Sequence, residues 1–278
     1  MPAVLFETVS EKTIKNFVSL SLCGSEKREK TQMKKLITIC AVVAMILVVS
    51  GAAQATTTVQ GFESDTGDWA GTITRVNSPL TPAGGSWYAI VQQDAYTYFD
   101  HAASPVWTGP YTQSIDVYID TTAGAIGDKW NFDMGIRRAS DGTWLDDTGI
   151  GAGKAADGWY VDYTGNAGEY GGGGTKIDTS GWYTIGAVWT AGSSFLTRHV
   201  FVEPLNGAEI YSFDNTKNYQ GLGLDPAHQP GGPSYGWFSQ LTMSGGLAVD
   251  NATLTVVPEP ATMALLGLGA LSLIRRKK

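Results

Sequence analysis

Adjacent carboxylates are the first candidates for chemistry in this chain. Asp146 and Asp147 lie side by side, with Asp141 before them and Asp157 after them. Two carboxylates can act together as general acid and general base, but neighbouring Asp residues in a loop more often form solvated turns or bind a cation. We expect this segment to be a loop that ends before Trp159. We therefore expect no catalytic pair here.

Histidine and cysteine offer little further chemistry. The three histidines, His101, His199 and His228, are scattered along the chain without the spacing of metal ligands. The chain also lacks a Gly-x-Ser-x-Gly motif, which would mark the nucleophile of a Ser-His-Asp hydrolase. Both cysteines, Cys23 and Cys40, precede residue 55, so we expect no disulfide or thiolate site in the rest of the chain.

Aromatic side chains are candidates for ligand contact. All nine Trp residues lie after residue 55, and two of them, Trp130 and Trp189, share a strand face with apolar neighbours and are expected in the core. Four aromatic residues follow turns that contain Pro or Gly: Trp107, Trp144, Tyr235 and Trp237. Exposed rings in loops can stack on the apolar face of a sugar, whereas the alternative is that they anchor the loops from inside.

The elements that must position these side chains show the period of two that is typical of β-strands. From Trp130 to Arg137, apolar residues alternate with polar or small ones. This alternation places Trp130, Phe132, Met134 and Ile136 on one face of a half-buried strand. Similar patterns predict strands over residues 114–120, 159–163, 183–189, 199–203 and 247–256.

Residues 56–257 are predicted to form one domain, because no linker or internal repeat interrupts them. Turn signals, among them Asn206-Gly207 and Pro230-Gly231-Gly232-Pro233, separate the predicted strands. No sustained helical pattern occurs in this part of the chain. The sequence therefore predicts an all-β fold, an antiparallel β-sandwich of the jelly-roll type.

The start of the chain contains a predicted export signal. A basic segment over residues 33–35 precedes an apolar run over residues 36–49 and an Ala-x-Ala end at Ala55. This order is that of a signal peptide over residues 33–55, with a helical apolar run. Residues 1–32 lack such a pattern, and we interpret them as a start-site artefact or a disordered leader.

The end of the chain has a similar three-part order. Pro258, Glu259 and Pro260 precede an apolar, helix-permissive run over residues 261–274, and the last four residues are Arg, Arg, Lys and Lys. The run is shorter than the roughly 20 residues of a stable membrane-spanning helix, and the basic end would stay in the cytoplasm. The pattern indicates either a segment held briefly in the membrane and then cut away, or an unprocessed hydrophobic anchor.

Together, Pro258-Glu259-Pro260, the apolar run and the basic end resemble the PEP-CTERM sorting signal of Gram-negative bacteria that make exopolysaccharide. On this basis the sorting signal covers residues 258–278. The resemblance implies that a membrane transpeptidase of the exosortase type recognises the motif and removes the tail. It also implies export to the cell surface or extracellular matrix after transient anchoring in the inner membrane, with membrane contact only through the uncleaved C-terminal segment.

A second resemblance extends over most of the predicted domain. The segments that carry it are Gly61-Phe62-Glu63 with Trp69, residues 114–120, residues 180–184, Asn206-Gly207 and residues 249–254. They are similar to segments of the jelly-roll sandwiches of concanavalin-A-like lectins, glucanases and carbohydrate-binding modules. The resemblance implies a sandwich fold and a place for glycan binding.

The resemblance does not extend to the catalytic motif of the glucanases. Retaining glucanases of this type carry Glu-Ile-Asp-x-Glu on one strand, where alternate carboxylates share a face. The nearest segment here is Ser114-Ile115-Asp116-Val117-Tyr118, with Ser114 and Tyr118 in the positions of the nucleophile and the acid/base. We therefore predict no catalytic residue and a protein that is not an enzyme.

Glu63 and Asp250 resemble the first-strand and last-strand carboxylates that hold a structural Ca²⁺ in some carbohydrate-binding jelly rolls. Hard oxygen ligands suit Ca²⁺, although both residues could instead be ordinary edge or cap residues. Residues 56–257 carry 8 Lys and Arg against 21 Asp and Glu, which leaves a formal charge of −13. Such a surface gathers cations and repels nucleic acid, so no nucleic-acid partner is expected.

These features predict an exported protein of the cell surface or the exopolysaccharide matrix. Its expected role is non-catalytic, either binding of extracellular polysaccharide or a purely structural one. The alternative is a secreted glycoside hydrolase or polysaccharide lyase of the lectin-like sandwich type.

Overall fold

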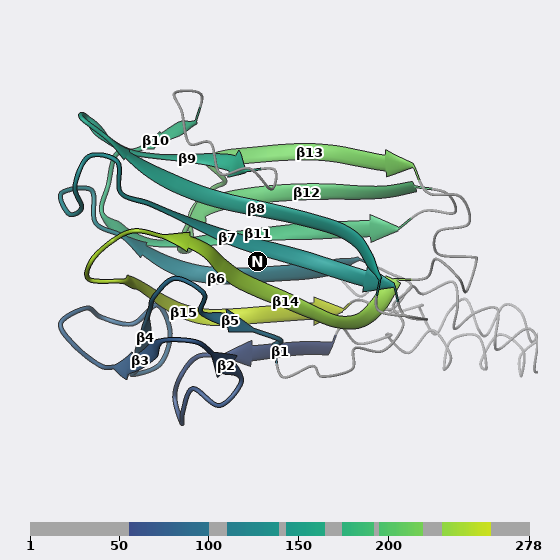
Figure 1. The fold of residues 1–278 in the computed structure, drawn as a ribbon, viewed down its shortest axis with the longest axis horizontal. Helices are drawn as coiled ribbons and strands as arrows, with labels where there is room; N and C mark the ends of the chain where they lie inside the picture. The colour runs from purple at the N-terminus through teal and green to yellow at the C-terminus, as the bar shows by residue number, and fades with distance from the viewer. Residues whose placement is uncertain are drawn as a thin grey trace, which may run out of the picture. The chain divides into compact units, whose positions relative to one another are not determined.

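The computed structural model describes residues 56–99, 110–138, 143–164, 174–191, 195–218 and 230–256. Within these ranges the chain forms strands and turns, and it contains no helix that could span a membrane. The strands form two antiparallel sheets that pack face to face (Figure 1). The predicted antiparallel jelly-roll sandwich is thereby confirmed, while the two predicted terminal helices and the boundaries at residues 32 and 55 lie outside the described residues.

Sheet A is the sheet that contains both ends of the described chain. Its strands, in spatial order, are β13 (Tyr211–Asn218), β12 (Phe195–Pro204), β11 (Gly181–Ala191), β6 (Tyr111–Ile119), β15 (Leu247–Val256), β4 (Tyr88–Val91) and β3 (Ile73–Val76), and β1 (Thr56–Gln60) pairs with β15. The neighbours β6 and β15 are far apart in the sequence, as are β11 and β6. Long connections between adjacent antiparallel strands are typical of jelly rolls.

Sheet B packs against sheet A, and its strands alternate in the sequence with those of sheet A. Its strands, in spatial order, are β10 (Thr175–Ile177), β9 (Gly158–Thr164), β8 (Trp144–Ala155), β7 (Lys129–Arg138), β14 (Pro230–Leu241), β5 (Tyr96–Thr97) and β2 (Trp69–Ala70). All of the strand pairs in both sheets are antiparallel. The chain therefore crosses between the sheets several times, and each sheet depends on residues from distant parts of the sequence.

The core lies between the sheets and follows the alternation seen in the sequence. On β7, Trp130, Phe132, Met134 and Ile136 are all at most 1% exposed, which confirms the predicted inward face. The prediction of a half-buried strand is wrong, because the residues of the opposite face from Asn131 to Gly135 are buried as well. Trp189 on β11 is also fully buried, as predicted. Burial of each such large apolar side chain contributes roughly 1.5–3 kcal/mol, and it is the main stabilising term of a domain whose described residues contain no cysteine.

Two segments predicted as loops are strands instead. The segment that starts at Trp144 and contains Asp146 and Asp147 is the first part of the twelve-residue strand β8. The prediction was wrong because several glycines follow in this strand, and Gly is rare in strands. β8 still forms, because it lies between β7 and β9 and pairs with both. The predicted turn at Pro230–Pro233 is the start of β14, and a register shift follows it between Gly231 and Tyr235.

A buried ion pair joins the sheets. Arg198 on β12 donates through Nη1 to both oxygens of Asp146 on β8, at 3.0 and 2.8 Å, and the two side chains are 2% and 1% exposed. Asp146 also accepts from Trp189 Nε1 at 2.9 Å and from the ammonium group of Lys217. The Arg198 Nη2 donates to the Tyr163 hydroxyl at 2.9 Å, so the pair is enclosed in a network that spans both sheets.

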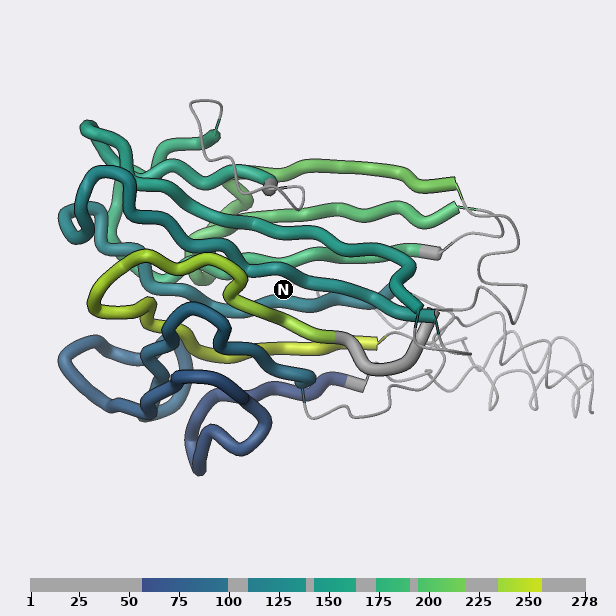
Figure 2. Tube along the Cα trace, in the orientation of Figure 1, coloured from purple at the N-terminus to yellow at the C-terminus, as the bar shows by residue number. Residues whose placement is uncertain are grey.

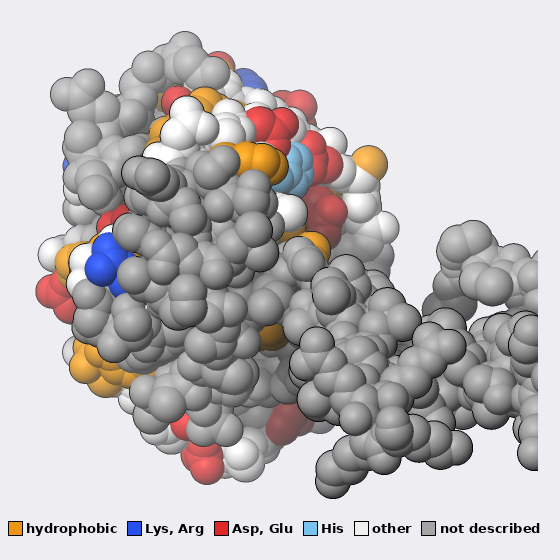
Figure 3. Space-filling view, turned by 90° about the vertical axis from the view of Figure 1, so that its right-hand side faces the viewer, with side chains coloured by type: hydrophobic (Ala, Val, Ile, Leu, Met, Phe, Trp, Pro, Cys, Tyr) orange, Lys and Arg blue, Asp and Glu red, His pale blue; other side chains and the backbone are white. Residues whose placement is uncertain are grey.

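A second ionic group lies at the surface of sheet A. The ring of His199 contacts Asp214 through Nδ1 at 2.8 Å and Glu209 through Nε2 at 3.0 Å. Partial burial lowers the pKa of His199, but the bonds to the two carboxylates outweigh this effect and raise it above the usual value. Figure 3 shows acidic side chains beside a histidine on the face that it draws, as expected for an acidic domain.

We expect Arg198→Met to lower the free energy of unfolding by about 3–5 kcal/mol, because it leaves the carboxylate of Asp146 buried without its main partner. Urea unfolding would measure the change. Lys176→Met is the matched control, because Lys176 forms an exposed pair with Asp157 and its loss should leave the urea midpoint almost unchanged. Equal effects of the two substitutions would contradict the role given to the buried pair.

Candidate functional site

The outer face of sheet B collects the predicted aromatic residues. On β14, Tyr235 and Trp237 lie opposite Gly135 and Asp133 of β7, and Asp147 of β8 lies opposite Gly135 from the other side. The neighbours of these residues along the strands, such as Met134 and Phe238, are fully buried in the core. Because side chains alternate along a strand, Tyr235, Trp237, Asp133 and Asp147 all face away from the core.

The rings of Trp144 and Tyr235 lie against each other on this face. Their ring centroids are 4.7 Å apart at an interplanar angle of 66°, and Trp144 is 44% exposed. The guanidinium of Arg137 lies over the Trp144 ring, 3.9 Å from its centroid. Gly135 lies under both rings, since a Cβ there would come within 2.6 Å of Tyr235 and 2.7 Å of Trp144. A residue with any side chain at this position would therefore push the two rings apart.

The row of aromatic rings continues onto β5. Tyr96 pairs in register with Trp237 and hence shares its face. Tyr98, two residues further, is 41% exposed, and its ring lies 5.5 Å from that of Tyr96 at 76°. Rings on neighbouring strands are separated by about 4.8 Å per strand. The rings from β8, β14 and β5 thus form a row that crosses the strands of sheet B.

Polar groups lie beside this row. Asn131 Nδ2 donates to Asp133 Oδ1 at 2.6 Å and to Ser239 Oγ at 2.9 Å. The Tyr235 hydroxyl donates to Asp147 Oδ1 at 3.3 Å. Carboxylate, amide and hydroxyl groups of this kind can hold the hydroxyl groups of a sugar whose apolar face stacks on a ring.

Both carboxylates of the face have raised pKa values. Burial, followed by the charge of Asp133, raises the pKa of Asp147 to about 6, against the opposing hydrogen bond from Tyr235. Burial likewise raises the pKa of Asp133, and the hydrogen bonds from Ser239 and Asn131 oppose the shift. At neutral pH the two groups therefore repel each other, and a proton can bind to Asp147 under mildly acidic conditions.

Glycines on β8 leave a strip of the outer face without side chains. Gly149 and Gly151 lie opposite Asp133 and Asn131 of β7, and Gly151 lies opposite Asp162 of β9 on the other side. They share the outward direction of those residues, because Ile150 and Ala152 between them are fully buried. Gly149 and Gly151 are nevertheless buried, and Asn131 and Asp133 beside them are 4% and 7% exposed, so this part of the outer face is covered.

The structure brings three of the four predicted aromatic residues together. Trp144, Tyr235 and Trp237 lie on one face of sheet B, although on strands and not on loops. Trp107 lies outside the described residues. Sequence reasoning missed Asp133 as a site residue, and the alternation of β7 could have found it, because Asp133 falls on the side opposite to Phe132 and Met134.

The glucanase-like segment lies on the other sheet. Ser114 and Asp116 are on β6 of sheet A, far in topology from the aromatic row of sheet B. Asp116 is 5% exposed and accepts hydrogen bonds from Thr184 Oγ1 at 2.6 Å and Asn251 Nδ2 at 2.9 Å. Burial raises its pKa despite these bonds. Asp116 is thus a buried carboxyl with a structural role.

The two predicted calcium ligands meet at one loop, between β3 and β4, at the end of the sandwich where the early loops gather (Figure 2). Glu63 Oε1 accepts from the backbone N–H groups of Ser86 at 2.9 Å and Trp87 at 3.1 Å. Asp250 Oδ2 accepts from the N–H of Gly84 at 3.0 Å. Both carboxylates therefore hold the same loop through its backbone donors.

Calcium binding at this pair stays a prediction. Among the described residues, no group of three or more His, Cys, Asp or Glu side chains is arranged to hold a metal ion. Asp250 is fully buried, and burial raises its pKa to about 6 although Gly84 and Asn251 donate to it. The nearby charge of Asp116 adds to this rise. A cation here would relieve the repulsion between two buried carboxyl groups.

Comparison with known families bears on the end of the chain. Residues 256–278 match the family model described as the PEP-CTERM protein-sorting motif. The predicted motif at Pro258, Glu259 and Pro260 is confirmed by this match, although these residues lie outside the described structure. The motif indicates an exported protein and implies processing by an exosortase. No curated protein matches the chain.

Solved structures with a similar fold come from varied proteins. They include the CBM2 module of the evolved Dit of Lactobacillus casei BL23 phage J-1 (11% identity, 74% of this chain and 98% of that chain, TM-score 0.38). They also include lectin II from Ulex europaeus (8% identity, 75% of this chain and 100% of that chain, TM-score 0.39). A third is the PL-14 alginate lyase from Aplysia kurodai (10% identity, 75% of this chain and 100% of that chain, TM-score 0.40). The description of this chain as a sandwich rests on its own strand topology.

The raised pKa of Asp250 makes a prediction about stability and pH. The pKa of an Asp is near 4 in the unfolded chain, and that of Asp250 is about 6 in the folded protein. The stabilisation of the folded state by the protonated Asp250 is therefore present below pH 4 and is lost as the pH rises through 6. Asp250→Asn mimics the protonated acid and should reduce the fall in unfolding free energy between pH 4 and pH 7 by about 1–2 kcal/mol. Urea unfolding at the two pH values measures this, and an unchanged pH dependence would contradict it.

If Glu63 and Asp250 bind Ca²⁺, the melting temperature should rise with added calcium at pH 7.5 and much less at pH 5, where Asp250 binds a proton instead. Thermal unfolding with CaCl₂ and with EDTA measures the difference. MgCl₂ is the control for nonspecific screening of the acidic surface. Equal melting temperatures with CaCl₂ and EDTA at pH 7.5 would exclude a calcium site.

Proposed function

We propose that this protein is an exported, non-catalytic glycan-binding protein, and that the outer face of sheet B is its binding surface. The observation that carries the proposal is the pair of rings of Trp144 and Tyr235, which close over Gly135 beside the carboxylate of Asp147. Aromatic rings next to hydrogen-bonding side chains are the combination that a sugar ring requires, with one apolar face and several hydroxyl groups.

The shape of the face supports a chain-like ligand. The aromatic row runs across β8, β14 and β5, so several sugar units could stack on it in succession. The partly exposed carboxylate of Asp147 would accept hydrogen bonds from hydroxyl groups, and its charge together with that of the buried Asp133 would repel a uronic acid at neutral pH. We therefore expect the ligand to be a neutral extracellular polysaccharide.

The sorting motif supports the location of this activity. A protein that an exosortase processes is exported, and we propose that it acts at the cell surface or in the exopolysaccharide matrix of a Gram-negative bacterium. Glycan binding would then attach the protein to the matrix in which it is released. The predicted mature domain, residues 56–257, contains the whole of the proposed face.

A specific observation favours a second candidate, a glycoside hydrolase or polysaccharide lyase. Asp133 and Asp147 occupy diagonal positions on neighbouring strands, and both have raised pKa values. A carboxyl with a pKa near 6 could act as a general acid while its neighbour is ionised. Release of new reducing ends or of unsaturated products would distinguish this candidate from binding alone.

The test is an array of neutral and acidic polysaccharides, probed with the full chain in detergent and read for both retention and new chain ends. We expect retention on neutral glycans without new ends, and at least a tenfold loss of affinity in Trp144→Ala, which corresponds to about 1.4 kcal/mol of lost contact. Phe195→Ala is the matched control, because Phe195 is 41% exposed and lies on sheet A.

The outcomes separate three roles. Retention that Trp144→Ala abolishes and Phe195→Ala preserves would support binding at the face of sheet B. New chain ends would favour the hydrolase or lyase. An array that shows neither retention nor cleavage would overturn the proposal and favour a purely structural protein.

A further inference from the structure

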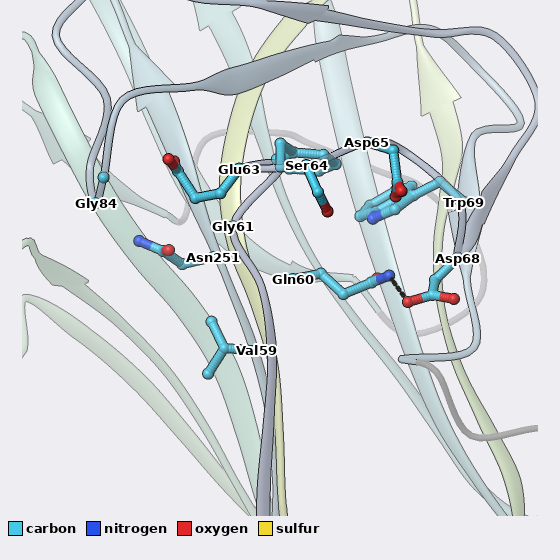
Figure 4. Close-up of a pocket in the computed structure, with 12 residues that line it drawn as sticks. Val59, Gln60, Gly61, Glu63, Ser64, Asp65, Asp68, Trp69, Gly84 and Asn251 are labelled. Atoms are coloured by element: carbon cyan, nitrogen blue, oxygen red, sulfur yellow. Dashed lines mark hydrogen bonds between the residues drawn. The ribbon is translucent and has the colours of Figure 1, made fainter.

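Figure 4 shows a cavity of about 360 Å³, and none of the residues that line it belongs to the aromatic row. It is lined by the end of β1, the loop from Gly61 to Asp68, the ring of Trp69, and the backbone of Gly84 and Gly85 with the side chain of Asn251. Its volume is at the lower end of the range of small-molecule sites. The cavity can therefore hold a ligand of a few carbon and oxygen atoms, but not a polymer.

A buried donor without a partner lies in the wall of this cavity. The Trp69 ring is 8% exposed, and it packs against Phe62 at 5.8 Å and Phe238 at 6.4 Å between ring centroids. Its Nε1 is buried and has no hydrogen-bond partner. Figure 4 shows this nitrogen on the ring edge that faces Ser64 and Gln60. A buried unsatisfied donor costs roughly 1–3 kcal/mol, so a ligand that accepts from it would recover that energy.

The other polar groups of the cavity are mainly acceptors. Asp65 Oδ1 accepts a hydrogen bond from the N–H of Gly67 at 2.9 Å, and Glu63 Oε1 accepts from two backbone N–H groups. Each carboxylate has further lone pairs that can accept from a ligand. Asp68 accepts from the amide of Gln60, and the carbonyl of that amide accepts from Thr97 Oγ1 at 2.8 Å. The cavity therefore combines one unpaired N–H donor with several carboxylate acceptors.

This combination selects the chemistry of the ligand. A metal ion would satisfy the carboxylates but would leave the Trp69 donor without a partner. An anion would accept from Trp69 but would be repelled by Glu63, Asp65 and Asp68, which all line the cavity. A neutral hydroxyl group can both accept from an indole N–H and donate to a carboxylate. A neutral molecule with several hydroxyl groups meets both requirements, and it would replace water, which can make the same bonds.

We propose that this cavity binds one neutral sugar unit, with a sugar hydroxyl that accepts from Trp69 Nε1 and others that donate to the carboxylates of Asp65 and Glu63. The site is separate from the face of sheet B and does not depend on the function proposed for that face. It takes a single terminal unit, whereas the aromatic row takes a length of chain. The two sites together would allow the protein to hold a glycan end and a glycan chain.

The test follows the nine indole N–H signals of the ¹⁵N-labelled full chain in detergent by NMR. Glucose, galactose and mannose are added separately as neutral sugars. Glucuronate and CaCl₂ are added in separate samples to test an anionic ligand and a metal ion. We expect one of the neutral sugars to shift the Trp69 signal in a saturable way, with a Kd of about 1 mM or tighter. Trp69→Phe, which retains a ring of similar packing but no donor, assigns the signal.

Saturation-transfer signals of the sugar give its affinity in the variants, and Trp144→Phe on sheet B is the matched control. We expect at least a tenfold loss of affinity in Trp69→Phe and no loss in Trp144→Phe. The reverse pattern would place the sugar on sheet B and overturn the proposal. A Trp69 signal that moves with glucuronate or CaCl₂ but not with a neutral sugar, or with none of them, would overturn it as well.

Discussion

The rest of the structure depends on the ion pair between Asp146 and Arg198, because it is a buried charge contact that crosses from one sheet to the other. Arg198 occupies an inward position of β12, in the same row as Leu196 and Val200, where an apolar residue would be expected. An isolated charge there would cost several kcal/mol, so Arg198 is tolerated only where β8 supplies a carboxylate. The pair therefore fixes which part of sheet B lies over β12, in a core whose apolar contacts alone are not directional.

The same contact determines the geometry of the proposed binding face. Adjacent residues of a strand point to opposite sides, so the inward direction of Asp146 forces Asp147 outward. Arg198 Nη1 also donates to the backbone carbonyl of Asp147 at 3.0 Å, which holds the strand at this point. The register irregularity of β7 and β8 lies next to it and brings Trp144 opposite Arg137 on the outer face. A contact in the core thus places a ring and a carboxylate on the surface.

The sequence allowed the core and the fold class to be predicted, because alternation is a local property that survives in strands such as β7. It could not give the different roles of Asp146 and Asp147, since these depend on a partner in β12 that is distant in the sequence. The glycines of β8 hid a central strand, because its stability comes from its neighbours and not from its own residues. Gly135 carried no signal either, as its function is to leave space for two rings from other strands.

The two outer faces of the sandwich differ in a way that assigns their roles. Each carries a pair of carboxyl groups with raised pKa values, Asp116 and Asp250 on sheet A and Asp133 and Asp147 on sheet B. On sheet A the pair is bonded to Thr184, Asn251 and the loop that contains Gly84, so its hydrogen-bonding capacity serves the fold. On sheet B the pair lies beside exposed rings and is bonded mainly to side chains of the same face. The partly exposed Asp147 and the exposed ring of Trp144 retain capacity for an external ligand, and this difference between the faces supports the proposal that places recognition on sheet B.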